Sequence, residues 1–322
     1  MRFIDAETTC RHLGFAPLIE ALRQMFNEGC EVPLRHTHSV GEGTLLLMPA
    51  WRAGRRLGIK TVTVFPGNSA RGVPGLHSIY LLFDAATGVP LALLDGDQLT
   101  SRRTAAASAL AASFLARADA NRLLIVGTGR VASLIAEAMQ VVRPLTEVVV
   151  WNHRAPAAQA LAGQLREQGF QARSSTDLAA AVAAADIVSC ATLSTAALIR
   201  GEWLRPGTHL DLIGSFTPAM CEADAACFQR SRVYVDTLEA LDKSGDVLRA
   251  VEAGAFQPDQ LAGTLAELCR GTRAGRGSAA QITLFKAVGS ALEDLAAAER
   301  VFEGVQADSV SLAPATAIDR AP

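Results

Sequence analysis

The chain has 322 residues, of which 50% are hydrophobic and 19% charged, and its formal net charge is −2. A chain of this length can form two domains with separate cores, and the composition is that of an ordinary soluble globular protein. The near-neutral charge excludes a basic surface for nucleic acid and an acidic tail.

The sequence predicts neither a leader segment nor a membrane span. Arg2, Asp5 and Glu7 interrupt the N-terminus before an apolar signal sequence can form. The apolar stretch at residues 178–199 contains Asp186, and it predicts a helix followed by a strand rather than a transmembrane helix. The six cysteines form no C-x-x-C pair, which is typical of small buried side chains in a reducing compartment. We therefore expect a cytoplasmic protein.

Residues 1–118 predict a mixed α+β domain. An amphipathic helix is expected at residues 17–27, and Thr100 is expected to cap an alanine-rich helix at residues 101–116. Short apolar runs between Gly, Pro and Asn turns predict strands at residues 44–48, 57–65, 78–84 and 90–95. The H-x-H sequence at residues 36–38 lacks a third ligand, so no metal site is expected.

Residues 119–278 alternate between strand and helix patterns, which predicts a doubly wound parallel sheet of the Rossmann type. The strand candidates are residues 123–127, 147–151, 170–173, 187–191, 208–213 and 232–236. A helix pattern from Ala279 to Glu303 follows, and we expect it to pack back onto the first domain. The first domain is thus 1–118 plus 279–304, and residues 305–322 are typical of a flexible tail.

The most informative segment is the turn after the first strand of that sheet. Gly127, Gly129 and Ala132 have the G-x-G-x-x-A spacing of a dinucleotide-binding turn, with an apolar strand before it and a helix pattern after it. Gly127 permits the tight turn, Gly129 lets the backbone approach a pyrophosphate, and Ala132 allows close helix packing. The predicted cofactor residues are Gly127, Thr128, Gly129, Arg130 and Val131, together with Thr192 and Gly289 farther along the chain.

The residues after the strand at 147–151 indicate which nicotinamide dinucleotide binds. An NAD-binding protein usually places an Asp or Glu here to hold the ribose, and this chain has Asn152, His153 and Arg154 instead. Asn152 can reach a ribose hydroxyl, and the two basic residues suit a 2′-phosphate. The pattern favours NADP(H), with NAD(H) as the alternative. Arg154 also has an ordinary interpretation as a solvated residue before the helix that Pro156 opens.

Several cations are candidates for a substrate site, although each has an ordinary structural interpretation. Lys60 shares a strand face with valines, and it either extends from a sheet edge to solvent or points into a cleft. Arg102 and Arg103 stand in the first turn of the predicted alanine-rich helix, where a cation is unfavourable unless an anion meets it. Arg35 has no distinguishing context of its own.

From Val32 to Glu303 the assembled motifs resemble the ornithine cyclodeaminase/mu-crystallin family. The segments that carry the resemblance are Leu57-Gly-Ile-Lys60, Asp97-Gln-Leu-Thr-Ser-Arg-Arg103-Thr-Ala-Ala, Val126-Gly-Thr-Gly129, Ser244-Gly-Asp246-Val and Ile282-Thr-Leu-Phe-Lys286-Ala-Val-Gly289-Ser-Ala-Leu-Glu-Asp294. The resemblance implies a substrate and dimerisation domain closed by the C-terminal helix, a Rossmann domain, and a homodimer. It also implies that Arg35, Lys60 and Arg103 surround the carboxylate and the reacting C–N centre of a small substrate.

One departure from the family pattern bears on the reaction. True cyclodeaminases have an aspartate in a G-G-D-C-P motif after the fifth strand of the Rossmann domain, whereas this chain has Gly214-Ser-Phe216-Thr-Pro218. Phenylalanine cannot transfer a proton. Asp211, Glu222 and Asp246 are nearby acids, but none matches the position of the aspartate. We place Phe216 among the substrate-binding residues.

These observations predict an NAD(P)H-dependent reductase that transfers hydride to a cyclic imine carboxylate, either Δ1-pyrroline-2-carboxylate or its six-membered homologue. The product would be proline or pipecolate. Two alternatives remain. One is an ornithine cyclodeaminase, a lyase that recycles NAD and releases ammonia from ornithine. The other is a non-catalytic protein that binds NADPH and a small ligand, as mu-crystallin binds thyroid hormone.

Overall fold

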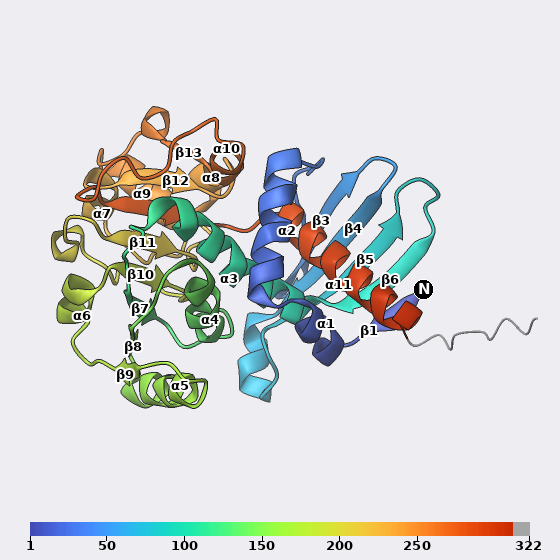
Figure 1. The fold of residues 1–322 in the computed structure, drawn as a ribbon, viewed down its shortest axis with the longest axis horizontal. Coiled ribbons are helices and arrows are strands. Elements are labelled where there is room, and N and C mark those ends of the chain that lie inside the picture. Colours follow the sequence, from blue (N-terminus) through green and yellow to red (C-terminus); the bar gives the residue numbers. More distant parts are fainter. Residues whose placement is uncertain (312–322) are drawn as a thin grey trace, which may run out of the picture.

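The computed structural model describes residues 1–311 and contains two β-sheets with helices around them (Figure 1). One sheet has eight strands, all parallel, and the other has six mixed strands. The predicted fold class, a Rossmann-type parallel sheet with a mixed α+β domain, is confirmed. Among the described residues, no helix is long and apolar enough to cross a membrane.

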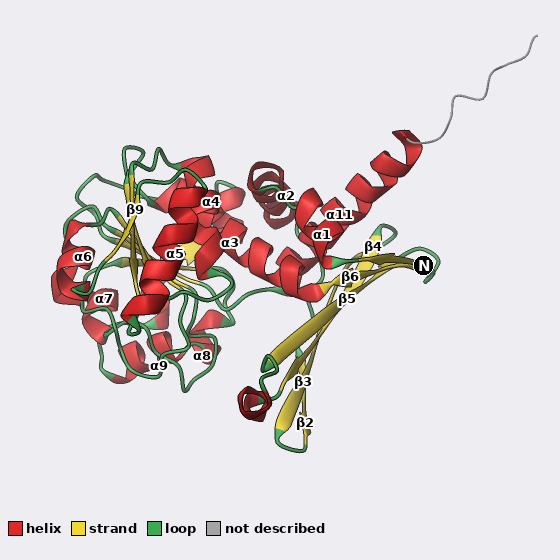
Figure 2. Cartoon of the chain, turned by 90° about the horizontal axis from the view of Figure 1, so that it is seen from below, coloured by secondary structure: helices red, strands yellow, loops and turns green. Residues whose placement is uncertain are grey.

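The six-stranded sheet has the order β1-β6-β5-β4-β3-β2, in which only the β1–β6 pair is parallel. Its strands are β1 (Arg2–Ile4), β2 (His36–Val40), β3 (Gly43–Arg52), β4 (Arg56–Val64), β5 (Leu76–Asp84) and β6 (Pro90–Asp95), with the 3₁₀ helix η1 (Pro66–Arg71) before β5. Helices α1 (Ala6–His12), α2 (Phe15–Glu28) and α11 (Ala291–Ser311) lie on one face of this sheet (Figure 2). The domain core is the layer between that face and the helices.

The eight-stranded sheet has the order β13-β12-β14-β11-β10-β7-β8-β9. Its strands are β7 (Arg122–Val126), β8 (Glu147–Trp151), β9 (Ala172–Ser174), β10 (Ile187–Cys190), β11 (His209–Leu212), β12 (Arg232–Val235), β13 (Gly263–Thr264) and β14 (Thr283–Lys286). The surrounding helices are α4 (Ala132–Val142), α5 (Ala155–Glu167), α6 (Leu178–Ala184), α7 (Ala225–Gln229), α8 (Ala240–Lys243), α9 (Gly245–Glu252) and α10 (Leu265–Cys269), with short 3₁₀ turns η2 (Gly201–Trp203) and η3 (Pro258–Gln260). The strand order reverses between β7 and β10, which is where this fold binds its ligand.

The C-terminal part of the chain differs from the prediction. The helix expected from Ala279 begins at Ala291, because residues 283–286 form β14 and pair with β11 on one side and β12 on the other. The helix then continues to Ser311, so residues 305–311 are helical where a flexible tail was expected. The rest of that predicted tail, residues 312–322, lies outside the described residues. The division of the chain into two domains stays a prediction, with β14 now assigned to the Rossmann sheet.

Helix α3 (Gly96–Leu115) joins the two domains and is buried along most of its length. It begins five residues earlier than predicted, because the Asp95 side chain caps it by accepting a hydrogen bond of 2.7 Å from the Gln98 N–H. The expected cap, Thr100, lies inside the helix instead. Arg102 and Arg103 are therefore in the second turn, where the unfavourable effect of the helix dipole is small.

Candidate active site

Three elements distant in sequence bring a buried cluster of charged side chains together. Lys60 on β4 places its Nζ 2.7 Å from Asp294 Oδ2 of α11. Arg103 on α3 donates from Nε to the other Asp294 oxygen at 2.8 Å and from Nη1 to Glu293 Oε2 at 2.6 Å. None of the four side chains is more than 6% exposed. We call Lys60, Arg103, Glu293 and Asp294 the charged cluster.

The electrostatics of the charged cluster follow from burial and pairing. Burial lowers the pKa of Lys60 to about 8, even though Asp294 opposes this shift. Burial alone would raise the pKa of Asp294, but Arg103 and Lys60 hold it below its usual value. Burial raises the pKa of Glu293 to about 7 against the opposing effect of Arg103. Arg103 keeps its charge, because the two carboxylates raise its pKa despite the opposing effect of burial. Lys60 is therefore a buried acid that titrates near neutral pH.

The loop after β14 brings Arg35 close to the charged cluster. Gly289 in this loop has a φ of +79°, and a Cβ atom there would lie 2.8 Å from Arg103 Nη1. The Asp236 carboxylate fixes the loop by accepting hydrogen bonds from the N–H groups of Val288 and Gly289, at 2.8 and 2.7 Å. Arg35 donates to the Gly289 carbonyl at 3.0 Å. Arg35 and Arg103 thus lie at the same loop, and their sharing of a substrate site stays a prediction.

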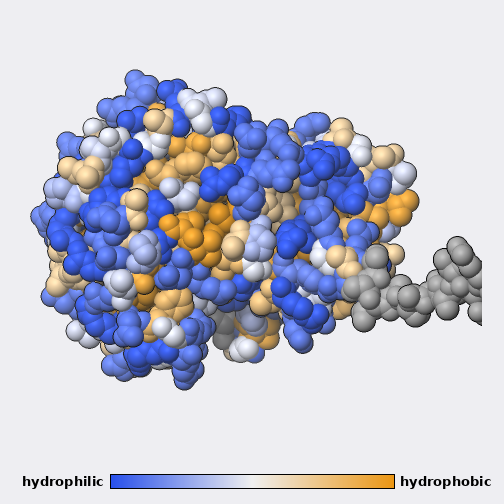
Figure 3. Space-filling view, in the orientation of Figure 1, coloured by the Kyte–Doolittle hydropathy of each residue, from blue (hydrophilic) through white to orange (hydrophobic). Residues whose placement is uncertain are grey.

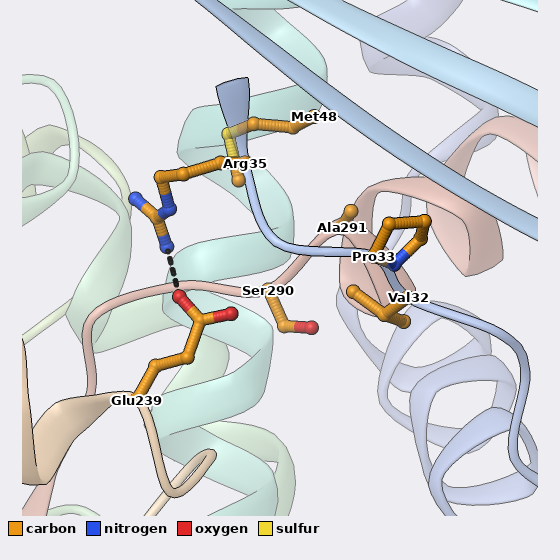
Figure 4. A pocket seen from close by; sticks show the side chains of 7 residues that line it. All are labelled: Val32, Pro33, Arg35, Met48, Glu239, Ser290 and Ala291. Carbon is orange, nitrogen blue, oxygen red and sulfur yellow. Dashed lines mark hydrogen bonds and ion pairs between the residues drawn. The ribbon is translucent and has the colours of Figure 1, made fainter. Parts of the chain in front are cut away.

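A small pocket adjoins this loop, between the two domains (Figure 4). Its lining residues are Val32, Pro33, Arg35, Met48, Glu239, Ser290 and Ala291. Within it, Arg35 and Glu239 point toward each other, and Arg35 Nη2 lies 3.4 Å from Glu239 Oε2.

The predicted dinucleotide turn has the geometry that its sequence requires. Gly127 has a φ of +115°, and a Cβ atom there would lie 2.5 Å from the Ala191 carbonyl oxygen, so only glycine fits. A Cβ atom on Gly129 would meet nothing within 4 Å, which leaves its backbone open to a ligand. The next residue, Arg130, forms an ion pair with Asp97 in the first turn of α3, with 2.7 Å between Nη1 and Oδ2. The turn fits a pyrophosphate, and an ion pair connects it to the helix that carries Arg103.

The residues after β8 connect to this turn through Asn152. Its side-chain amide donates to Thr128 Oγ1 at 3.0 Å, and its side-chain oxygen accepts the Arg154 N–H at 2.9 Å. His153 and Arg154 are exposed to solvent at the start of α5. This exposed position fits both sequence interpretations of Arg154, a contact for a phosphate bound from solvent and a solvated residue before the helix.

Phe216 follows β11 and is 37% exposed. The acids near it in the sequence have other partners. Glu222 accepts the N–H groups of Thr192 and Gly214 at 2.7 Å each, and burial raises its pKa to about 7. Asp211 accepts hydroxyl hydrogen bonds on both of its oxygens, and burial raises its pKa to about 6. Asp246 accepts the N–H groups of residues 222 and 223. Glu222 and Asp246 hold the loops at the end of the sheet, whereas Asp211 connects β11 to β10 and α3.

Sequence reasoning missed the acids that hold the predicted cations. Glu293, Asp294 and Glu239 were not selected, although the first two stand in an otherwise apolar helix segment, Ala291-Leu-Glu-Asp-Leu-Ala-Ala-Ala. Two adjacent carboxylates within such a segment indicate buried cation partners, because isolated carboxylates are almost never fully buried. Glu239 carried no comparable signal.

Comparison with known proteins identifies the family. Residues 4–309 match the Ornithine cyclodeaminase/mu-crystallin family. The chain belongs to this family. A Δ1-pyrroline-2-carboxylate reductase of Colwellia psychrerythraea is 36% identical over 313 residues, which are 94% of this chain and 99% of that protein.

Two solved structures resemble this one over nearly their whole length. The Δ1-pyrroline-2-carboxylate reductase of Thermococcus litoralis, in complex with NADH and L-proline, has a TM-score of 0.91 at 30% identity and covers 96% of this chain and 98% of its own. An archaeal alanine dehydrogenase dimer with bound NAD has a TM-score of 0.90 at 28% identity, covering 95% of this chain and 96% of its own. The prediction of an NAD(P)-dependent oxidoreductase acting on C–N bonds is confirmed.

Removal of Asp294 tests the charged cluster. Asp294→Ala leaves Lys60 and Arg103 with too little buried negative charge, and breaking such a pair costs about 3–5 kcal/mol of unfolding free energy. Glu7→Ala, which removes an exposed partner of Arg11, is the control and is expected to cost less than about 1 kcal/mol. Urea unfolding followed by circular dichroism measures both. Equal losses in the two variants would show that the cluster is not energetically distinct.

Proposed function

We propose that this protein reduces a cyclic imine carboxylate of the Δ1-pyrroline-2-carboxylate type to the cyclic amino acid, with NADPH as the preferred cofactor. The observation that carries the proposal is that Arg35 and Arg103 lie at the loop after β14, and that Asp294 pairs Lys60 with Arg103. A relative of this chain is named for that reaction, and a solved neighbour was crystallised with NADH and L-proline, the product expected from that imine.

The cations divide the work of binding and proton transfer. Arg35 and Arg103 bind the substrate carboxylate, for which the planar guanidinium is well suited. Lys60 faces the imine nitrogen, stabilises charge there and donates a proton, directly or through water. When bound, the dihydronicotinamide supplies the hydride that reduces the C=N carbon. The turn at residues 127–131 holds the pyrophosphate of the cofactor, with Thr192 and Gly289 lining its path. Phe216, which is partly exposed after β11, would form an apolar wall of the substrate site when the cofactor and substrate are bound.

The engaged acids favour reduction over ornithine cyclodeamination. A cyclodeaminase needs a carboxylate to handle water and two amine groups, and Phe216 occupies the position where the family places it. Asp211 and Glu222 accept backbone and hydroxyl hydrogen bonds, and Asp246 accepts backbone N–H groups and forms an ion pair with the buried Lys286. We therefore place the lyase second. We place the non-catalytic ligand-binding protein third, because this chain keeps Lys60 and Arg103, the cations that a catalyst would need.

We also propose that the protein is a homodimer formed through the uncovered face of the six-stranded sheet. The strand register aligns Phe3, Leu93, Leu81, Ile59 and Pro49 in one row across five strands. Their chain neighbours point to the helix layer, so this row points away from it. The opposite, helix-covered side of this domain is mostly hydrophilic (Figure 3). A monomer in sedimentation velocity at micromolar concentration would contradict this proposal.

The reaction itself is tested by two assays and a pair of variants. The unmodified protein is expected to oxidise NADPH when a cyclic imine carboxylate is added and to release negligible ammonia from ornithine. Phe216→Asp should lower kcat/KM for the imine about 10–100-fold, because a carboxylate at the proposed apolar wall would repel the substrate carboxylate, whereas Phe216→Leu should stay within about threefold. Robust ammonia release from ornithine with catalytic NAD would overturn the reductase assignment.

The pH dependence tests the proton donor. The pKa of Lys60 is about 8, so Lys60 is protonated below that pH and donates a proton. The kcat for imine reduction should be level below pH 8 and fall about tenfold per pH unit above it. Oxidation of the cyclic amino acid needs neutral Lys60, so its kcat should rise with pH toward a plateau above 8. Lys60→Met should abolish both the fall in kcat for reduction and the rise in kcat for oxidation around pH 8. A pH dependence that persists in that variant would show that another group is the proton donor.

The cofactor preference is tested at Arg154. NADPH is expected to bind more tightly than NADH, and Arg154→Ala should narrow or reverse this ratio by losing a charge-assisted phosphate contact of about 1.5–3 kcal/mol. Arg173→Ala is the matched control, because it removes an exposed arginine from neighbouring β9. Titration of intrinsic fluorescence with each cofactor gives the dissociation constants. Tighter binding of NADH than of NADPH by the unmodified protein would rule out the preference for NADPH.

The cytoplasmic localisation expected from the sequence stays a prediction.

A further inference from the structure

Arg35, which we assign to the substrate carboxylate, already holds a carboxylate of the protein. Glu239, at the start of α8 in the Rossmann domain, lies 3.4 Å from Arg35 Nη2 across the pocket in Figure 4. The two residues are 204 positions apart in the chain, so this contact joins the two domains. It involves one nitrogen and one oxygen at a long distance, rather than the paired short contacts of a strong arginine–carboxylate interaction. The contact is therefore easy to exchange.

A second cation keeps Glu239 paired when Arg35 leaves it. Lys243, one turn farther along α8, forms an ion pair with the same carboxylate oxygen. Arg35, Glu239 and Lys243 together carry one net positive charge, which a single substrate carboxylate neutralises. After the exchange, the substrate pairs with Arg35 and Glu239 pairs with Lys243, so no charge is left alone in the pocket.

We propose that the Glu239 carboxylate occupies the place of the substrate carboxylate at Arg35 in the free enzyme. When the substrate binds, its carboxylate replaces Glu239 at Arg35, and Glu239 pairs with Lys243 alone. This inference rests on the proposed function, because it requires a carboxylate ligand at Arg35. It makes Glu239 a specificity-determining residue, since a neutral ligand cannot displace it from Arg35 and only an anionic one can. Binding of the substrate would then also break the Arg35–Glu239 contact between the two domains.

The exchange predicts effects of opposite sign for its two members. Glu239→Gln removes the competitor, so an anionic ligand should bind about two- to fivefold more tightly, the range expected for a partly exposed ion pair. Lys243→Met leaves Glu239 with Arg35 as its only cation, so the same ligand should bind about two- to fivefold more weakly. Asp242→Asn, which removes one negative charge from the same short helix, should leave the affinity unchanged.

Binding of an unreactive ligand tests this without relying on turnover. We would titrate the cofactor-saturated protein with pyrrole-2-carboxylate, a planar five-membered ring with the same carboxylate, and with pyrrole-2-carboxamide, its neutral counterpart, by isothermal calorimetry. The opposite shifts should be seen for the carboxylate and be absent for the carboxamide. Equal carboxylate affinities in the unmodified protein and in Glu239→Gln, or shifts of the same sign in Glu239→Gln and Lys243→Met, would overturn the exchange and leave the proposed function standing. Failure of the carboxylate to bind any of the proteins would reject the carboxylate site itself, and the exchange with it.

Discussion

The arrangement of this protein depends on one buried carboxylate that serves two cations. Asp294 gives one oxygen to Lys60 and the other to Arg103, and all three side chains are removed from water. Two cations this close together and this deeply buried would repel each other and one would lose its proton without such a partner. Because the three residues lie on β4, α11 and α3, the same interaction fixes how the sheet, the C-terminal helix and the connecting helix pack.

The charged cluster also explains how a lysine in a strand of valines becomes chemically useful. Burial alone would force Lys60 to be neutral, and full exposure would leave its pKa too high for proton exchange at neutral pH. The partial compensation by Asp294 leaves the pKa of Lys60 at about 8. Glu293 supplies a further negative charge to Arg103, with which it forms an ion pair, in addition to the Asp294 carboxylate that the two cations share. The incomplete balance gives Lys60 the pKa that its proposed role as proton donor needs.

The features that the sequence predicted are those set by local physics. The turn at Gly127 is recognisable because its positive φ and its contact with the Ala191 carbonyl exclude any side chain. The parallel strands are recognisable as short apolar runs between turns. Local patterns could not reveal contacts such as Arg35–Glu239, which joins residues 204 positions apart. The late strand β14 was hidden for a related reason, since the apolar run before Ala291 continues into a helix pattern and periodicity alone does not separate them. Thr100 was chosen as the cap because the helix was expected too late, whereas Asp95 ends a strand and begins the helix at once.

The position of β14 has a consequence for how the protein is made. The strand fills the gap between β11 and β12, although β12 and β13 both precede it in the chain. During synthesis, the Rossmann sheet therefore exists as two parts whose facing edges have unpaired N–H and C=O groups, and such edges attract other strands. The other domain is also unfinished at that stage, because α11 supplies its last helix and the carboxylate of Asp294. Both domains therefore depend on the segment from β14 to α11: without it the edges of β11 and β12 stay unpaired, and Lys60 and Arg103 lack the carboxylate that they share.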